Sequence, residues 1–113
     1  MLARPQRLVR ERDFREIYRR GERLIGTHVL IRAVASRRPT SRFAVVMSTK
    51  TSKSAVVRNR HKRQVRAVLA ELIPALPVGW DVIVTIVRTV RDRSLWPSFR
   101  EEIRSLLARR FLS

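Results

Sequence analysis

The sequence has 113 residues, a formal net charge of +17 and a pI near 12.0. This length predicts one domain, and an apolar content of 44% argues against a disordered basic tail, since such a chain can bury enough surface to offset its ordering entropy. The absence of cysteine excludes disulfides, thiolate zinc sites and cysteine nucleophiles. No apolar signal segment or membrane-length run is present, so we expect a cytoplasmic protein.

The positive charge is concentrated in one part of the chain. From Arg23 to Ala70 there is no Asp or Glu, but there are nine Arg and three Lys. Nucleic acid and an anionic membrane surface are the partners that suit such a segment. The excess of Arg over Lys favours RNA or DNA, because the guanidinium fork matches phosphate.

The segment 10–20 is predicted to form the first helix. Phe14, Ile17 and Tyr18 fall at i, i+3 and i+4, with Arg and Glu on the other faces. Gly21 follows as a candidate helix cap. Taken alone, this apolar pattern is that of a core stripe.

Strands are predicted next. Residues 27–34 are rich in β-branched side chains, and Leu24-Ile25 is a candidate short strand before them. The segment 37–41 contains Pro and small polar residues and predicts a turn, which is followed by a strand over 43–47. Two strands joined by so short a loop are expected to pair as an antiparallel hairpin.

A polar loop over 48–54 leads to a long predicted helix over 55–73, which Pro74 and Pro77 end. Residues 82–87 form a nearly continuous β-branched run, the pattern of a strand covered on both faces.

A last helix follows Pro97, where Ser98 and Glu101 have capping-box spacing. The predicted order is α-β-β-β-α-β-α.

The long helix separates its side chains into two arcs on a helical wheel. The apolar arc holds Val57, His61, Val65, Val68, Leu69 and Leu72. The opposite arc holds Asn59, Arg60, Lys62, Arg63 and Arg66, and Arg58 falls at the edge, where its head is expected to reach outward. Residues 58–66 contain no carboxylate to pair with these cations. The pattern predicts a basic face held on a packed scaffold, for which we expect a nucleic-acid partner.

Two runs resemble a known family: RFAVVMSTK at 42–50 and AVVRNRHKR at 55–63. They resemble the protein subunit of bacterial ribonuclease P, which has a small-residue strand ending in Ser/Ala-Lys, a loop, and Ala-Val-x-Arg-Asn-Arg-x-Lys-Arg on its central helix. Residues 13–21 are similar to its first helix, and the element order matches over essentially the whole chain. The resemblance implies a single α+β domain over 1–113, with a small mixed sheet packed by helices and a left-handed β-α-β crossover.

The resemblance also implies roles for particular residues. The catalytic RNA is expected to contact the motif on the central helix and the loop before it. The candidates are Lys50, Lys53, Arg58, Asn59, Arg60, Lys62, Arg63 and Arg66. A cleft between the first helix and the sheet is expected to receive the single-stranded 5′ leader of precursor tRNA, with Phe14, Tyr18, His28 and Ile31 as candidates.

The chain departs from the family pattern at three single positions and in one loop. His28 and Ile31 stand where aromatic residues often line the leader cleft, and His61 stands where the family usually has Ile or Val. The loop 51–54 lacks the Gly often present there.

No catalytic or metal-binding residue is expected in the protein itself. The carboxylates show no clustered metal-ligand pattern, and the histidines stand apart from them. Asp13 and Glu16 have the i, i+3 spacing of a carboxylate pair, but we expect them to form ion pairs with neighbouring Arg residues instead. His61 is expected to be a core or edge residue. The resemblance implies an endoribonuclease whose RNA subunit carries the chemistry and the Mg²⁺.

The expected partners are ribonuclease P RNA and precursor tRNA, without DNA or membrane, and the protein is expected as a monomer in the complex. Three other classes remain as alternatives. A basic ribosomal-type protein is the nearest of them and predicts no effect on precursor-tRNA cleavage. A helix-turn-helix DNA binder lacks its preceding short helix here. A membrane-surface helix would leave the strands without a core partner.

Overall fold

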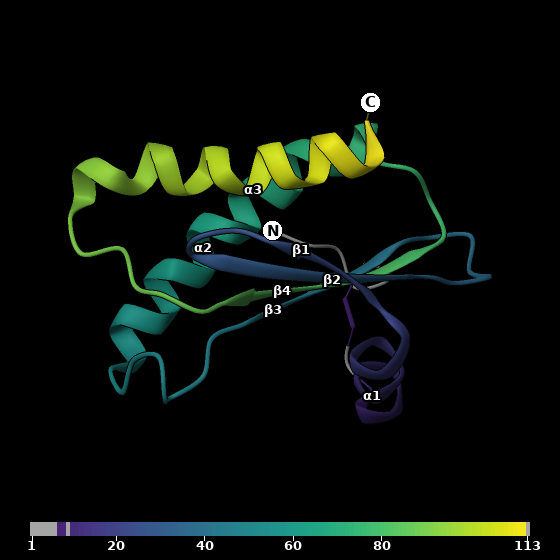
Figure 1. The fold of residues 1–113 in the computed structure, drawn as a ribbon, viewed down its shortest axis with the longest axis horizontal. Coiled ribbons are helices and arrows are strands. Elements are labelled where there is room, and N and C mark those ends of the chain that lie inside the picture. The colour runs from purple at the N-terminus through teal and green to yellow at the C-terminus, as the bar shows by residue number, and fades with distance from the viewer. Residues whose placement is uncertain (1–6, 9, 113) are drawn as a thin grey trace.

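The computed structural model describes residues 7–8 and 10–112. Within these residues, three helices and four strands follow one another in the predicted order, and Figure 1 shows their arrangement. The helices are α1 (Glu11–Arg20), α2 (Ala55–Leu72) and α3 (Trp96–Phe111). The strands are β1 (Glu22–Ile25), β2 (Val29–Ala35), β3 (Arg42–Val46) and β4 (Trp80–Ile86), and the short 3-10 turns are η2 (Ile73–Ala75) and η3 (Arg93–Leu95). The expected α+β class is confirmed.

The four strands form one mixed sheet in the order β1-β2-β4-β3. β2 pairs antiparallel with both β1 and β4, whereas β3 pairs parallel with β4. The predicted hairpin of the second and third strands is therefore wrong, because β4 lies between them. β4 has the β-branched run that suits burial on both faces, and the long β3–α2–β4 connection returns the chain parallel to β3. The left-handed sense of this crossover stays a prediction.

The two faces of the sheet are covered differently. Figure 1 shows α3 on one side of the sheet and α1 on the other. Val29, Ile31 and Ala33 of β2 belong to the main core with side chains of α2 and α3. The alternate residues point to the opposite face, where α1 buries Ile17 against Ala44 and Ile83 in a smaller cluster.

The start of α3 differs most from the sequence expectations, whereas the first two helices agree within one residue at each end. α3 begins at Trp96, so Pro97 lies in its first turn, where a missing N–H costs nothing. The predicted capping box at Ser98 is therefore wrong, since this residue already lies inside the helix. Gly21 caps α1 as predicted, with its N–H donating to the Ile17 carbonyl at 2.8 Å.

No helix within the described residues is long and apolar enough to cross a membrane.

Candidate nucleic-acid interface

The start of α2 is fixed by local hydrogen bonds. The Ser54 hydroxyl accepts from the Val57 N–H at 3.2 Å and so caps the helix. Arg58 is half-buried, and its Nη1 donates to the Ser52 carbonyl at 2.8 Å. This bond braces the loop before α2, which has no glycine, and leaves Arg58 less free to meet a ligand than the other cations of the helix.

The two arcs of α2 are confirmed. His61, Val65, Val68 and Leu69 are buried, and Val57 and Leu72 are partly buried. On the opposite arc Asn59, Arg60, Arg63 and Arg66 are exposed and Lys62 is half-buried, while Lys50 and Lys53 are exposed on the preceding loop. None of these cations forms an ion pair with a carboxylate of residues 7–8 or 10–112. The surface therefore presents uncompensated positive charge on a rigid helix.

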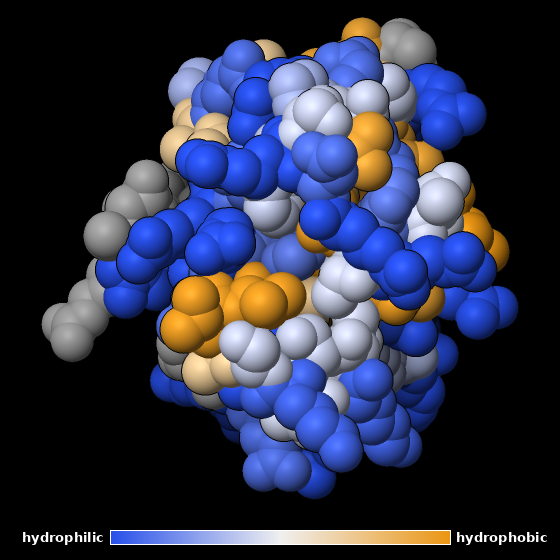
Figure 2. Space-filling model, turned by 90° about the vertical axis from the view of Figure 1, so that its left-hand side faces the viewer, coloured by the Kyte–Doolittle hydropathy of each residue, from blue (hydrophilic) through white to orange (hydrophobic). Residues whose placement is uncertain are grey.

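A groove joins this helix to α1. It has a volume of about 260 Å³, and its lining includes Phe14 of α1, Val46 of β3 and Arg66 of α2. An aromatic ring and a guanidinium at one groove are the groups that hold single-stranded nucleic acid by stacking and phosphate contact. On the side of the molecule that holds the start of α2, Figure 2 shows an apolar patch among hydrophilic side chains.

The apolar and aromatic residues of α1 are not all core residues. Ile17 is fully buried and Phe14 partly buried, but 48% of Tyr18 is exposed. The Tyr18 ring lies under the guanidinium of Arg32, with the Arg32 carbon 4.8 Å from the ring centroid. Of the three residues of the predicted apolar stripe, only Ile17 is fully buried in the core.

The sheet face beside α1 also carries an unsatisfied hydroxyl. The Thr85 side-chain oxygen is buried and has no hydrogen-bond partner within the described residues. In the strand register Thr85 lies opposite Leu30 of β2 and Val46 of β3. Val46 lines the groove of Phe14, so this hydroxyl lies next to the candidate leader surface.

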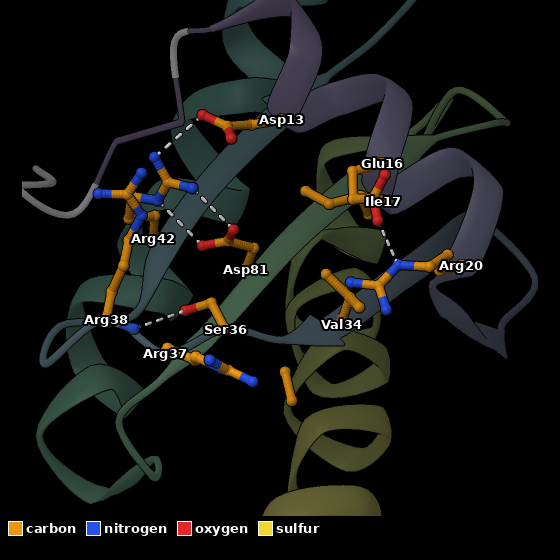
Figure 3. Close-up of a pocket in the computed structure, with 11 residues that line it drawn as sticks. Asp13, Glu16, Ile17, Arg20, Val34, Ser36, Arg37, Arg38, Arg42 and Asp81 are labelled. Carbon is orange, nitrogen blue, oxygen red and sulfur yellow. Dashed lines mark hydrogen bonds and ion pairs between the residues drawn. The ribbon is translucent and has the colours of Figure 1, made fainter.

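Arg42 ties α1 to the sheet, as Figure 3 shows. It binds Asp81 of β4 through two nitrogens, with Nε–Oδ1 at 3.0 Å and Nη2–Oδ2 at 2.7 Å. Its Nη1 donates to Asp13 of α1 at 3.1 Å. Asp13 immediately precedes Phe14, so the ion-pair cluster sets where the aromatic edge of α1 meets the groove.

The hydrogen bond to Asp81 is the largest of the effects that raise the pKa of Arg42. Burial lowers this pKa, and the hydrogen bond to Asp13 raises it further. On the exposed side of α1 a hydrogen bond from Arg19 lowers the pKa of Glu16, and Arg20 pairs with the same carboxylate. The expected ion pairs of Glu16 with neighbouring arginines are therefore confirmed. For Asp13 the expectation of a neighbouring arginine is wrong, because its partner is Arg42 of β3.

Two predicted leader residues do not lie with Phe14 and Tyr18. Ile31 is fully buried in the core between the sheet and the α2–α3 layer, so its expected place in a cleft beside α1 is wrong. The physical reason is strand alternation, which puts Ile31 on one face and Arg32 on the other. The His28 Nδ1 lies 3.0 Å from the Glu102 carboxylate of α3, and its ring packs edge-on to Phe99.

A second hollow lies where the chain leaves β4. Its lining includes Lys50, Arg88 and Arg91 together with His28, and no Asp or Glu. The structure thus separates Lys50 from the groove of Phe14 but places it with two arginines that follow β4.

Sequence reasoning missed Arg32, Arg88 and Arg91. The alternation of apolar and other residues around Ile31 could have assigned Arg32 to the open face, since its neighbours Ile31 and Ala33 are the core pair. No local signal marked Arg88 and Arg91, because their proximity to Lys50 depends on how β4 pairs.

Residues 7–8 and 10–112 contain no group of three or more His, Cys, Asp or Glu side chains that could hold a metal ion. The expected burial of His61 is confirmed, since only 2% of the residue is exposed.

Comparison with known proteins supports the family resemblance over the alternatives left open by the sequence. The Ribonuclease P family model matches residues 2–110. The ribonuclease P protein component of Cyanothece sp. is 37% identical over 96% of this chain and 94% of its own length. That of Microcystis aeruginosa is 38% identical over 91% of this chain and 88% of its own.

A solved structure agrees with these relatives. The ribonuclease P protein of Thermotoga maritima superposes with a TM-score of 0.73 at 27% identity, covering 91% of this chain and 98% of that one. A ribosomal-type protein is accordingly not favoured. With its basic α2, its aromatic groove and these matches over nearly its full length, the chain belongs to the ribonuclease P protein family.

Proposed function

We propose that this chain, as the protein component of ribonuclease P, holds two RNAs on adjoining surfaces and promotes removal of the 5′ leader from precursor tRNA. The basic arc of α2 binds the catalytic RNA. The groove of Phe14 and the open sheet face beside Tyr18 bind the single-stranded leader. The observation that carries the proposal is the groove itself, which joins Phe14 of α1 to Arg66 of α2.

Charge supports the first contact. A helix with exposed, uncompensated cations releases counterions from RNA when it binds, and this favours association at low salt. The cations on α2 are held by a buried arc, so their spacing is preset. Preset groups lose little freedom on binding and hold the two RNAs in a defined orientation.

Stacking supports the second contact. An aromatic side chain contributes about 1–3 kcal/mol for each stacked base and accepts any base. Phe14 and Tyr18 are the aromatic residues of α1, and Arg32 beside Tyr18 can meet a phosphate or stack in turn. Such a surface suits leaders of different sequence.

The chemistry is assigned to the RNA subunit, with Mg²⁺ bound there, and the protein acts as a monomer in the complex. The residues of this chain then bind, orient and reduce repulsion between two polyanions, a role that needs no catalytic side chain in the protein.

The test is cleavage of precursor tRNA by a bacterial ribonuclease P RNA at low magnesium, with and without the protein. Protein-dependent release of the 5′ leader is expected, and it should be largest at the lowest magnesium at which the RNA folds. Tight binding of the RNA without stimulation of cleavage would contradict the proposal and favour a structural RNA-binding role.

A further inference from the structure

The middle of α2 contains a buried histidine between two basic residues. His61 follows Arg60 and precedes Lys62, but only 2% of it is exposed. Its ring packs edge-on to Trp96 at 4.8 Å and to Phe99 at 5.9 Å between centroids. An aliphatic residue would fill such an apolar site without the cost of desolvating two ring nitrogens. A buried imidazole is therefore expected to have hydrogen-bond partners that offset this cost.

Both ring nitrogens have one. Nδ1 lies 2.8 Å from the Val57 carbonyl, and Nε2 lies 2.8 Å from the Val90 N–H. A carbonyl only accepts and a backbone N–H only donates, so these partners require the neutral tautomer with its proton on Nδ1. The first bond stays within α2, but the second leaves the helix and reaches the segment that follows β4.

That segment carries cations. Val90 lies between Arg88 and Arg91, which line the hollow that also contains Lys50. At its start the segment is held by the His28 carbonyl, which accepts from the Val87 N–H at 2.8 Å. Within the described residues, the hydrogen bond from the Val90 N–H to His61 joins this segment to α2.

We propose that His61 is a positioning residue for RNA binding: it ties residues 87–92 to α2 so that Arg91 and Arg88 extend the basic surface of the helix. A Leu at this position would occupy a similar volume, but it would leave the buried Val90 N–H without a partner, and the segment would shift or open. This inference rests on the proposed function, because it concerns how strongly the protein binds RNA.

The experiment is a double-mutant cycle on the complex of the protein with ribonuclease P RNA. The affinity of the protein for this RNA is measured for Arg91→Ala, His61→Leu and the double variant, with thermal unfolding used to show that each protein is folded. Arg91→Ala is expected to weaken binding roughly three- to tenfold in the wild type, as for a lost charged hydrogen bond, and less than twofold when His61 is Leu.

Two controls separate positioning from general damage. Arg63→Ala, on the exposed arc, should weaken binding by the same factor whether residue 61 is His or Leu. His61→Gln, whose carbonyl oxygen can accept from the Val90 N–H, should restore part of the Arg91 effect. Amide hydrogen exchange at Val90 should accelerate in His61→Leu and slow again in His61→Gln.

Equal effects of Arg91→Ala in both backgrounds, or no effect in either, would overturn the inference. The proposed function would stay intact in that case if Arg63→Ala still weakens binding. A null result for Arg63→Ala would instead count against the proposed RNA face. If His61→Leu does not fold, His61→Met, a flexible apolar residue, replaces it in the same cycle.

Discussion

One face of the sheet is sealed by α2 and α3, whereas the other is covered by α1 at one end and leaves Tyr18 and Ile25 exposed. The sealed face contains most of the buried apolar side chains, including Phe99, and the open face contains Arg32 and the unsatisfied hydroxyl of Thr85. The difference indicates that one face of the sheet provides most of the stability and the other face provides the binding surface.

The helix α2 belongs to both regions. Its apolar arc completes the sealed core, and its basic arc faces solvent beside the groove of Phe14. Because the same helix serves both, core substitutions are expected to alter stability first, and substitutions on the basic arc to alter RNA affinity with little change in stability. The following variants test that separation.

The largest expected effect is on the sealed face. Phe99→Ala should lower the free energy of unfolding by about 3–5 kcal/mol, because it removes a fully buried ring and leaves a cavity. Urea denaturation measures this change. Tyr18→Ala, on the open face, should change stability by less than about 1 kcal/mol. A similar loss in both variants would contradict the division between the two faces.

Arg42 connects the two regions. Arg42→Met should lower the free energy of unfolding by about 3 kcal/mol, since it leaves the buried Asp81 carboxylate without its partner. Precursor affinity should also fall, because α1 loses its tie through Asp13. Denaturation and binding are measured on the same preparations. In Arg42→Met/Asp81→Asn the unpaired charge is gone, so stability should partly recover.

On the open face, Phe14→Ala should reduce affinity for precursor tRNA by about 1–3 kcal/mol for one lost stacking contact and leave affinity for mature tRNA unchanged. Equilibrium binding to the two RNAs gives the difference. Phe14→Leu keeps an apolar side chain in the groove and serves as the control: if it binds precursor as well as the wild type does, stacking is not the cause.

On the basic arc, Arg60→Ala or Arg63→Ala should weaken association with ribonuclease P RNA by about 1 kcal/mol and reduce the salt slope by about 1. The measurement is affinity as a function of salt concentration. Arg104→Ala makes the same change in net charge, but Arg104 is already paired with Glu71 and Glu101, so it should leave the slope nearly unchanged. Equal slopes in all variants would contradict the assignment of the RNA face.

The smallest effect is expected at Thr85. Thr85→Val removes a buried hydroxyl without a partner and keeps the shape, so the free protein should gain about 0.5–1 kcal/mol of stability. If a leader nucleotide hydrogen-bonds this hydroxyl, precursor affinity should fall slightly in the same variant. Denaturation and precursor binding together distinguish the two roles.

Much of the candidate site could be predicted because it depends on local order. The two arcs of α2 follow from the helical period, and the breaks at Gly21 and Pro74 from the backbone chemistry of those residues. The family resemblance likewise rests on contiguous runs. The groove could not be predicted in this way, since Phe14 and Arg66 are far apart in the chain. They line one groove because α1 and α2 pack on opposite faces of the sheet, whose edge strand is β3.

By itself the sequence determined the charge of this protein, the class and order of its elements, and the amphipathic helix that presents the basic face. Each of these is a property of composition or of a short periodic segment. Tertiary structure decided that β4 separates β2 from β3, that Arg32 and not Ile31 faces α1, and that His61 bonds to Val90. These features depend on pairing between distant segments, and the period of a single strand or helix does not identify its neighbour.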